Sequence, residues 1–249
     1  MLVFIIMIEC EKIKNIVEKT NLKHVAIIMD GNRRWAKEKK LPSMFGHQKG
    51  VEALKNTLRA CSDFGIKYLT VYAFSTENWK RTPEEVNFLM ELLAKTLGNE
   101  LEEMHRENVC IRFIGDISTL SDKLQKILYN AENTTKNNTG VNLQIAFNYG
   151  ARSELVNTIK KIADLYATNK ITQNDINEDL ITKNLYTSGM PEPDLLIRTG
   201  GEYRISNYLL WQIAYSEFLV FDEYWPEFGK ELLSQAVFEF EKRNRRYGK

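Results

Sequence analysis

The sequence has few cysteines, few prolines and almost no net charge, and each shortage excludes a class of protein. Cys10, Cys61 and Cys110 are far apart and form no Cys-x-x-Cys pair, which argues against a disulfide framework or a zinc site and favours a reducing compartment. With 5 prolines and 13 glycines in 249 residues, the composition is neither collagen-like nor linker-rich. The 34 Lys and Arg residues balance 33 Asp and Glu residues to a net charge of +1, so we expect no nucleic-acid partner.

Membrane-spanning runs and nucleotide-binding loops are missing as well. The apolar run at residues 2–8 is too short to cross a bilayer and has no signal-peptide cleavage site. Without a Walker A loop or a Gly-x-Gly-x-x-Gly motif, neither nucleoside triphosphates nor dinucleotides are favoured ligands. We expect a cytoplasmic protein, peripheral at a membrane at most, with an N-terminal extension over residues 1–22 and one domain over residues 23–249.

Apolar segments of strand length alternate with longer helical patterns along the chain. Several segments are apolar at consecutive positions, as in strands covered on both faces. We predict strands at residues 25–29, 68–74, 109–114, 143–147, 195–197 and 218–221, and helices at 50–63, 84–106, 122–133 and 154–166. This alternation predicts a single α/β domain with a mainly parallel, six-stranded sheet flanked by helices.

The helix that follows Thr82 has the clearest signals. Thr82, Pro83 and Glu85 provide the N-cap, the first-turn proline and the capping-box glutamate. Apolar residues then recur at three- and four-residue steps from Val86 to Met104. This stripe either packs in the core or forms one wall of an apolar cavity.

Polar residues follow three of the predicted strands, at the sheet edge where open parallel sheets bind ligands. The first set is Asp30, Gly31, Asn32, Arg33, Arg34 and Trp35. A glycine at a helix start beside two arginines suits a phosphate group. A carboxylate at such a site indicates a hard cation such as Mg²⁺. The alternative is an Asp-Gly turn with solvated arginines.

The other two strand ends carry similar groups. The second set is Ser75, Thr76, Glu77, Asn78, Trp79 and Arg81, in which Trp79 either packs or contributes to a site. The third set has two arginines around a Gly-Gly turn, Arg198 and Arg204, followed by Ile205 and Ser206, and it suits a second phosphate. His47 is an anion donor at a helix start or a surface residue, and Glu217, among apolar residues, needs a cation or a donor.

Three motifs together resemble the cis-prenyltransferases, and most closely the bacterial undecaprenyl diphosphate synthase type. They run from His24 to Asn32, from Ala73 to Trp79 and from Asp194 to Glu202. The resemblance implies a homodimer whose subunits each carry a parallel sheet beside an apolar tunnel. It also implies Mg²⁺-dependent condensation of isopentenyl diphosphate onto an allylic diphosphate such as farnesyl diphosphate, with new cis double bonds. The product would be a long polyprenyl diphosphate, such as the undecaprenyl carrier precursor for cell-wall synthesis, handed to the membrane.

The resemblance also implies roles for individual residues. Asp30 and Asn78 correspond to catalytic residues, and Asp30 and Glu217 to metal ligands. The primer's diphosphate cradle corresponds to Gly31, Asn32, Arg34 and His47. The residues that position the incoming unit and its departing proton correspond to Ser75, Asn78, Trp79 and Arg81, and its diphosphate clamp to Arg198, Arg204 and Ser206. Further candidates for substrate binding are Arg33, Trp35, Ser43, Thr76, Glu77 and Ile205. Arg246 resembles a C-terminal arginine that in some members reaches the neighbouring subunit.

Three positions depart from the common pattern of the family. Ser43 stands where many members have an arginine that helps to bind the primer, and Arg33 stands where many have glycine. Tyr203 replaces a histidine that lies near the metal in some relatives. These departures bear on primer binding and metal coordination rather than on the class of reaction.

Two rival functions stay open at the level of the sequence. A non-catalytic partner subunit typically loses the first-motif aspartate, whereas this chain keeps Asp30, Asn78 and Arg198. A phosphoryl-transfer enzyme with Asp30 as nucleophile would need the second aspartate of an Asp-x-Asp motif, which is absent. The product can also be a shorter or a longer polyprenyl diphosphate.

Overall fold

The computed structural model describes residues 2–243, with side chains from residue 10 onward. At its centre is a six-stranded sheet in the order β3-β4-β2-β1-β5-β6, in which every neighbouring pair is parallel. The strands are β1 (His24–Ile28), β2 (Tyr68–Ser75), β3 (Cys110–Ile114), β4 (Asn142–Tyr149), β5 (Leu195–Arg198) and β6 (Glu217–Val220). The predicted single-domain α/β fold with six strands is confirmed.

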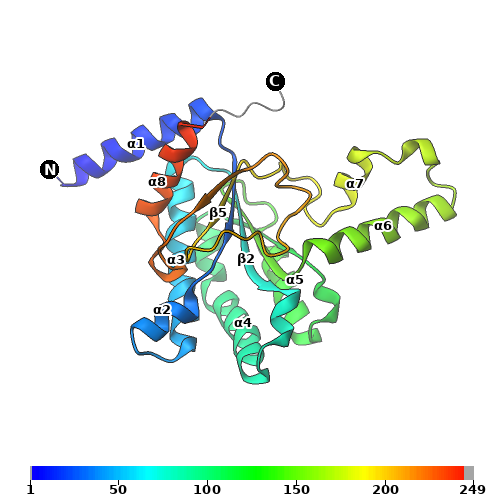
Figure 1. Ribbon diagram of the computed structural model, residues 1–249, viewed down its shortest axis with the longest axis horizontal. Coiled ribbons are helices and arrows are strands. Elements are labelled where there is room, and N and C mark those ends of the chain that lie inside the picture. Colours follow the sequence, from blue (N-terminus) through cyan, green and yellow to red (C-terminus); the bar gives the residue numbers. More distant parts are fainter. Residues whose placement is uncertain (1, 244–249) are drawn as a thin grey trace.

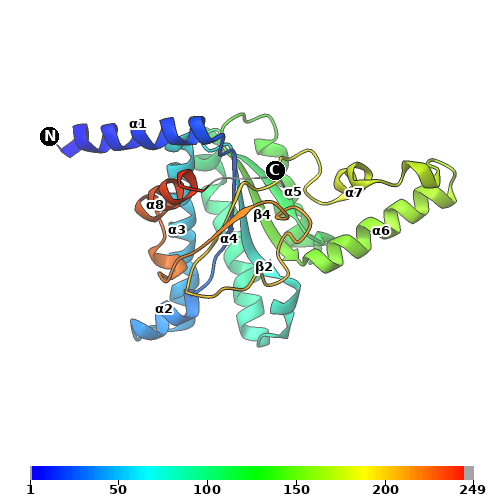
Figure 2. The same ribbon diagram turned by 45° about the horizontal axis from the view of Figure 1, so that its top comes forward.

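Helices cover both faces of the sheet (Figure 1). They are α1 (Leu2–Thr20), α2 (Asn32–Glu38), α3 (Ser43–Phe64), α4 (Pro83–Arg106), α5 (Asp122–Thr135), α6 (Ala151–Ala167), α7 (Glu178–Asn184) and α8 (Lys230–Glu241). On one face, α1, α3, α4, α5 and α8 share a core with Val25 and Ile27 of β1. On the other face, α6 and the segment after β5 pack against Ala26 and Ile28. The α6–α7 pair extends as an arm away from α1 and α8 (Figure 2).

The strand order places three strand ends side by side. β1 pairs with β2 on one side and with β5 on the other, so the chain changes direction across the sheet at β1. Ligands of open α/β sheets bind outside the carboxyl ends of strands at such a switch point. The three sets of polar residues found in the sequence follow β1, β2 and β5, and the topology therefore brings them to one place.

The second half of α1 belongs to the common core. Ile13, Ile16 and Val17 are each at most 6% exposed, and α1 packs on α3 and α8. The first turns of α1 project beyond the body of the protein in both views (Figures 1 and 2). No helix within residues 2–243 is long and apolar enough to cross a membrane.

His24 joins the amino end of β1 to β2 and to the loop before β5. Its Nδ1 lies 2.7 Å from the carbonyl oxygen of Pro191 and its Nε2 lies 2.7 Å from Thr70 Oγ1. A carbonyl only accepts, so Nδ1 carries the proton and Nε2 accepts from the Thr70 hydroxyl. Burial lowers the pKa of His24 to about 4, against the weaker opposing effects of Pro191 and the Asp194 charge. The buried ring is therefore neutral at physiological pH.

We expect the buried His24 to make folding sensitive to mild acid. The unfolded chain protonates the ring below about pH 6.5, whereas the folded chain resists protonation down to about pH 4. The contribution of the neutral ring to stability is thus complete above the pKa of the unfolded chain. It is lost as the pH falls from that pKa to the pKa of the folded chain. Urea titrations at about pH 7.5 and about pH 5 measure how far acid lowers the unfolding free energy of each protein. This decrease should be about 2 kcal/mol smaller in His24→Gln than in the wild type. Equal losses in the two proteins would show that His24 is not held neutral.

Candidate active site

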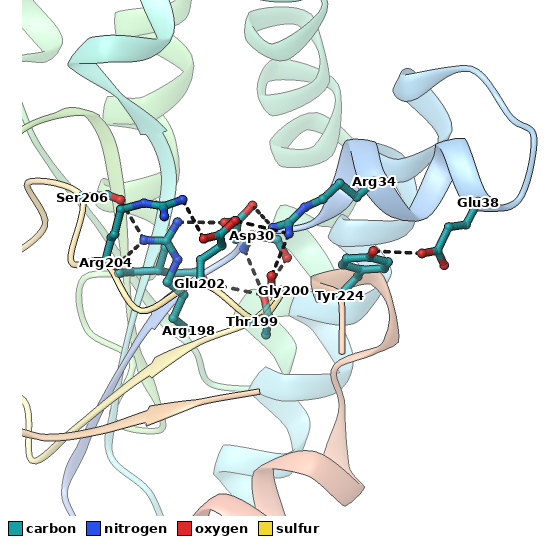
Figure 3. Close-up of polar contacts among 11 residues, drawn as sticks. Asp30, Arg34, Glu38, Arg198, Thr199, Gly200, Glu202, Arg204, Ser206 and Tyr224 are labelled. Carbon is teal, nitrogen blue, oxygen red and sulfur yellow. Dashed lines mark hydrogen bonds and ion pairs between the residues drawn. The ribbon is translucent and has the colours of Figure 1, made fainter. Parts of the chain in front are cut away.

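Asp30 lies at the carboxyl end of β1 between two arginines from different segments (Figure 3). Its Oδ2 accepts from Arg198 Nη2 at 2.8 Å, and its Oδ1 lies 3.1 Å from Arg34 Nη2. The backbone N–H of Asp30 donates to Thr199 Oγ1 at 3.0 Å, and the Thr199 hydroxyl donates to the Asp30 carbonyl oxygen at 2.7 Å. The end of β1 is therefore tied to the end of β5 through both backbone and side chain.

The arginines keep Asp30 ionised. Burial has the largest single influence and raises its pKa, but the hydrogen bonds and charges of Arg198 and Arg34 together outweigh burial, so the pKa lies below its usual value. Arg198 is only 6% exposed, and its Nη1 donates to Ser206 Oγ at 2.8 Å and to the Arg204 carbonyl oxygen. One guanidinium thus connects the carboxylate of the first motif to the loop of the third.

Two glycines allow this close packing. Gly31 has φ +105°, and a Cβ there would lie 2.5 Å from Tyr224 Cδ1. Gly200 has φ +83°, and a Cβ there would lie 2.6 Å from Arg34 Nη2. Arg34 stacks on the Tyr224 ring at 5.3 Å from its centroid and donates to the Gly200 carbonyl oxygen at 2.8 Å. Only glycine fits at these two positions without moving Tyr224 or Arg34.

A polar cavity of about 740 Å³ lies between Asp30, α2 and α3, and we call it the α2–α3 cavity. Its lining includes five basic side chains besides His47: Arg33, Arg34, Lys37, Lys40 and Arg81. Ser43, Gly31 and Asn32 complete the polar part of the wall. This concentration of positive charge in a chain of net charge +1 is the electrostatic signature of an anion site.

A second polar cavity of about 540 Å³, the β2–β5 cavity, lies on the other side of Asp30. Its lining includes Tyr72, Ser75, Glu77, Asn78, Arg81, Arg198, Ser206 and Asn207. Asn78 is fixed by a capping box, in which its Oδ1 accepts from the Ser75 backbone N–H at 3.0 Å. Arg81, which donates to Glu85 Oε1 at 2.8 Å, borders both cavities, as Asp30 does. The site therefore has two adjoining polar halves that both contain arginines, with the Asp30 carboxylate between them.

Two buried polar atoms at the junction of the cavities have no hydrogen-bond partner within the described residues. They are Asn32 Oδ1 and His47 Nε2. Burial lowers the pKa of His47 to about 4, helped by the positive charge of Arg81 and opposed by Glu85, whose Oε1 lies 3.7 Å away. Since buried polar groups normally have partners, a neutral His47 and Asn32 at a cavity wall indicate a polar ligand.

An apolar cavity of about 110 Å³ continues from this junction between α3 and α4. Its lining includes Leu89, Leu93, Leu97 and Met104 of the predicted stripe, together with residues of α3 such as Val51 and Leu54. The stripe therefore has both of its expected roles, since Val86, Leu89, Leu97 and Met104 also belong to the buried core.

The chain is similar over most of its length to known proteins of one family. The Prenyltransf family model, which describes undecaprenyl diphosphate synthases, matches residues 28–248. An isoprenyl transferase of Clostridium tetani is 51% identical over 226 residues, which are 91% of this chain and 89% of that protein. The ditrans,polycis-undecaprenyl-diphosphate synthase ((2E,6E)-farnesyl-diphosphate specific) of Micrococcus luteus is 47% identical over 226 residues, 91% of each protein. The crystal structure of lavandulyl diphosphate synthase from Lavandula x intermedia, in complex with dimethylallyl diphosphate, superposes with a TM-score of 0.90 at 35% identity, covering 93% of this chain and 100% of that one.

The chain belongs to the undecaprenyl diphosphate synthase family. The resemblance drawn from the three motifs is confirmed, and the protein is an enzyme of the cis-prenyltransferase class.

This prenyltransferase brings most of the predicted site residues to the two polar cavities. They are Asp30, Gly31, Asn32, Arg33, Arg34, Ser43, His47, Ser75, Glu77, Asn78, Arg81, Arg198 and Ser206. Trp35, Thr76, Trp79, Arg204 and Ile205 do not line either cavity. Arg246 lies outside the described residues.

Trp79 and Arg204 lie near the cavities but face elsewhere. Trp79 Nε1 donates to Asn148 Oδ1 at 2.7 Å, and the ring lies in a separate groove between α4 and α5. The Arg204 side chain is 67% exposed and its Nη2 lies 2.7 Å from Glu202 Oε2 (Figure 3). In this conformation Arg204 contributes its carbonyl oxygen to Arg198 rather than its guanidinium to the cavity.

Glu217 is not brought to Asp30 within one chain. Glu217 pairs with Leu195 at the start of β5, and Leu195 pairs with Val25, five positions before Asp30. At about 3.3 Å per residue, this offset places the two carboxylates toward opposite ends of the sheet. Glu217 Oε2 accepts instead from Arg243 Nη1 at 3.0 Å.

The sequence alone did not reveal several residues that line the cavities of this prenyltransferase. Lys37 and Lys40 line the α2–α3 cavity, and Tyr72 and Asn207 line the β2–β5 cavity. Arg33, Lys37 and Lys40 are spaced by four and three residues, so helical periodicity extended from Arg33 was a usable signal. Tyr72 and Asn207 had no such signal, because each is placed by the sheet and by the loop after β5.

Gly31→Ala tests the close packing at the start of α2. We expect it to lower the unfolding free energy by about 1–3 kcal/mol, because a Cβ at positive φ is strained and would overlap Tyr224. The matched control is Gly98→Ala in α4, where a Cβ has nothing within 4 Å and should stabilise by about 0.5–1 kcal/mol. Urea unfolding of both variants measures these changes. An unchanged unfolding free energy in Gly31→Ala would contradict the close packing of Gly31 against Tyr224.

Proposed function

We propose that this enzyme condenses isopentenyl diphosphate onto farnesyl diphosphate with new cis double bonds, and that its product is undecaprenyl diphosphate. The observation that carries the proposal is the ionised Asp30 between two polar cavities that both contain arginines, with an apolar cavity at their junction. Relatives that cover nine tenths of the chain are named for this reaction. Incubation with farnesyl diphosphate, labelled isopentenyl diphosphate and Mg²⁺, followed by sizing of the extracted lipid, tests it. Absence of elongated lipid would overturn the proposal.

The α2–α3 cavity is assigned to the diphosphate of the primer. Arg34 and the N-terminus of α2 at Gly31 supply forked side-chain donors and backbone N–H groups. Neutral His47 and Asn32 have buried polar atoms facing the same space. The adjoining apolar cavity receives the hydrocarbon chain, so the primer lies with its head on α2 and its tail between α3 and α4.

The β2–β5 cavity is assigned to isopentenyl diphosphate. Arg198 and Ser206 hold its diphosphate, and Ser75, Asn78 and Arg81 border the carbon skeleton. The two diphosphates would repel strongly in a partly dry site, and the arginines around Asp30 offset that repulsion. When the allylic C–O bond breaks, its electron pair leaves with the diphosphate, whose charge Arg34 is placed to stabilise. The double bond of isopentenyl diphosphate attacks the allylic carbon and forms the new C–C bond. The C–H bond on the neighbouring carbon then breaks beside Asn78, its electrons form the new cis double bond, and a diphosphate oxygen takes the proton.

The residues at the junction fit a bound Mg²⁺. Mg²⁺ is commonly held by one or two carboxylates together with substrate phosphates, and Asp30 is an ionised carboxylate that borders both cavities. Asp30 would hold the ion, which would neutralise charge on the departing diphosphate. Glu217 would have to come from a second subunit, because within one chain it lies toward the other end of the sheet.

The apolar cavity is proposed as the start of the product tunnel. Its volume of about 110 Å³ is smaller than the roughly 150 Å³ cavity that holds one benzene. A polyprenyl chain therefore requires α3 and α4 to move apart as it grows. Each added unit buries further apolar surface, at roughly 25 cal/mol per Å², which favours elongation into this layer.

Homodimer formation and a role for Arg246 across the subunit interface stay predictions. So do a cytoplasmic location and release of the lipid product to a membrane.

Asp30→Asn should abolish condensation while the fold survives. The substitution keeps the side-chain volume but removes the charge that would hold Mg²⁺, and we expect turnover to fall by at least about a hundredfold. Asp63→Asn, which removes a surface partner of Lys230, is the control and should stay fully active. Turnover of Asp30→Asn within about tenfold of wild type at saturating Mg²⁺ would refute the role of Asp30.

Arg198→Ala should weaken isopentenyl diphosphate more than the primer. Loss of a charged hydrogen-bond partner costs about 1.5–3 kcal/mol, or roughly ten- to hundredfold in KM. Arg204→Ala should act in the same direction but less, because Arg204 is exposed and bound to Glu202. Steady-state kinetics with each substrate varied in turn measures both effects. A rise in the primer's KM alone would mean that the two cavities are assigned the wrong way round.

Arg33 and Ser43 line the same cavity, so a double-mutant cycle can show whether Arg33 replaces an arginine at position 43. Arg33→Gly should raise the primer's KM about tenfold or more, and Ser43→Arg should restore most of that loss in the double variant. The Arg33 side chain is 61% exposed and its Nη1 lies 3.6 Å from Glu85 Oε2, and an ion pair this exposed is weak enough for Arg33 to exchange it for a diphosphate. An unchanged primer KM in Arg33→Gly would show that Arg33 is a surface residue without a role in primer binding.

A further inference from the structure

Residues 37–45 run from the last residues of α2 to the first turn of α3 and are all exposed, and we call these nine residues the rim segment. Three of them are large and apolar: Leu41, Met44 and Phe45 are 40%, 47% and 50% exposed. Three lysines, Lys37, Lys39 and Lys40, precede them in the same segment. Its one acidic residue, Glu38, accepts from the Tyr224 hydroxyl at 2.9 Å. The rim segment thus presents exposed apolar groups beside a net positive charge.

The position of the rim segment relates it to the site. Lys37, Lys40, Leu41 and Ser43 also line the α2–α3 cavity, so the segment forms its mouth. The end of α2 and the turn that follows project from the body of the protein (Figures 1 and 2). A flat surface can therefore approach this turn without first meeting the sheet.

We propose that the rim segment docks the enzyme on an anionic phospholipid bilayer. Apolar side chains beside lysines are the composition that binds membrane interfaces, with the apolar groups entering the headgroup boundary and the lysines meeting anionic lipids. Lys39 Nζ lies 3.8 Å from Glu227 Oε1 in an exposed ion pair. Charge complementarity still selects this occupant, because a purely apolar partner leaves the neighbouring Lys37 and Lys40 unmatched. Docking at the rim segment places the mouth of the α2–α3 cavity at the membrane, and the assignment of that cavity to the primer rests on the proposed function. A polyprenyl diphosphate then leaves for the bilayer without exposing its chain to water.

Other exposed apolar side chains lack this combination of position and charge. Val156 and Ile159 lie on α6, in the arm that extends away from α2 (Figure 1). Tyr129 of α5 is 66% exposed but is not among the residues that line the polar cavities. Tyr129 therefore offers a matched control for the loss of an exposed apolar group.

Vesicle sedimentation of the full chain, without substrates, tests the proposal. Wild-type protein should bind phosphatidylcholine vesicles that contain roughly 30% phosphatidylglycerol at least about tenfold more tightly than pure phosphatidylcholine vesicles, and about 0.5 M NaCl should remove the difference. Met44→Ser/Phe45→Ser should weaken binding to the anionic vesicles at least about fivefold. Tyr129→Ser should bind as the wild type does. Circular dichroism and thermal unfolding confirm that both variants fold.

Two results would overturn the proposal. One is unchanged binding of Met44→Ser/Phe45→Ser to the anionic vesicles, and the other is equal binding of the wild type to both kinds of vesicle. Condensation measured separately in detergent distinguishes this failure from failure of the proposed function. If the enzyme is active but does not bind the vesicles, docking is refuted and the proposed function stands. If only Met44→Ser/Phe45→Ser loses vesicle binding, docking is supported even when no lipid is elongated.

Discussion

The contact on which the site depends is the Asp30 carboxylate held between the Arg34 and Arg198 guanidiniums. Two diphosphates cannot approach each other in a half-buried site unless positive charge surrounds them, and arginines packed that closely need a carboxylate between them. Asp30 meets both needs. Its ionised side chain joins the loops after β1 and β5, and it faces both polar cavities. The same residue thus joins the loops that build the site and, under the proposed function, lies between the two diphosphates.

This charge arrangement requires unusually close packing of backbone around it. Beyond Gly31 and Gly200, α3 approaches α2 so closely that a Cβ at Gly46 would lie 2.0 Å from the Asn32 carbonyl oxygen. Trp225 Nε1 donates to the Gly50 carbonyl oxygen at 2.8 Å on the next turn. α3 therefore supports the polar cavity with its first turn and the apolar cavity with its following turns. One helix thus borders both a polar and an apolar cavity, as the head and tail of the proposed amphiphilic primer require.

Most of the fold could be predicted because its elements have strong local signals. The central strands β1 and β5 are short segments buried at every residue, whereas Arg112 of β3 is exposed. Helix α4 begins at Pro83 with Thr82 as its N-cap, as its capping sequence indicates. No helix was predicted at α1, α7 or α8, and at α2 and the beginning of α3 only helix starts near Gly31 and His47 were expected. α2 and α7 have seven residues each, too few for periodicity to emerge. α1 begins with an unbroken apolar run, which hides the amphipathic pattern that buries Ile13, Ile16 and Val17.

The sequence by itself determined the family, the parallel α/β class and the three sets of polar residues, because strand patterns and motifs are local in the chain. Only the tertiary structure decided which of those residues share a cavity. The order β2-β1-β5 brings Asn78, Asp30 and Arg198 together, whereas parallel register puts Glu217 toward the opposite end of the sheet. Trp79 follows the right strand, yet its bond to Asn148 turns it into another groove. Side-chain direction at a strand end depends on neighbours that are distant in sequence, and so no local pattern could fix it.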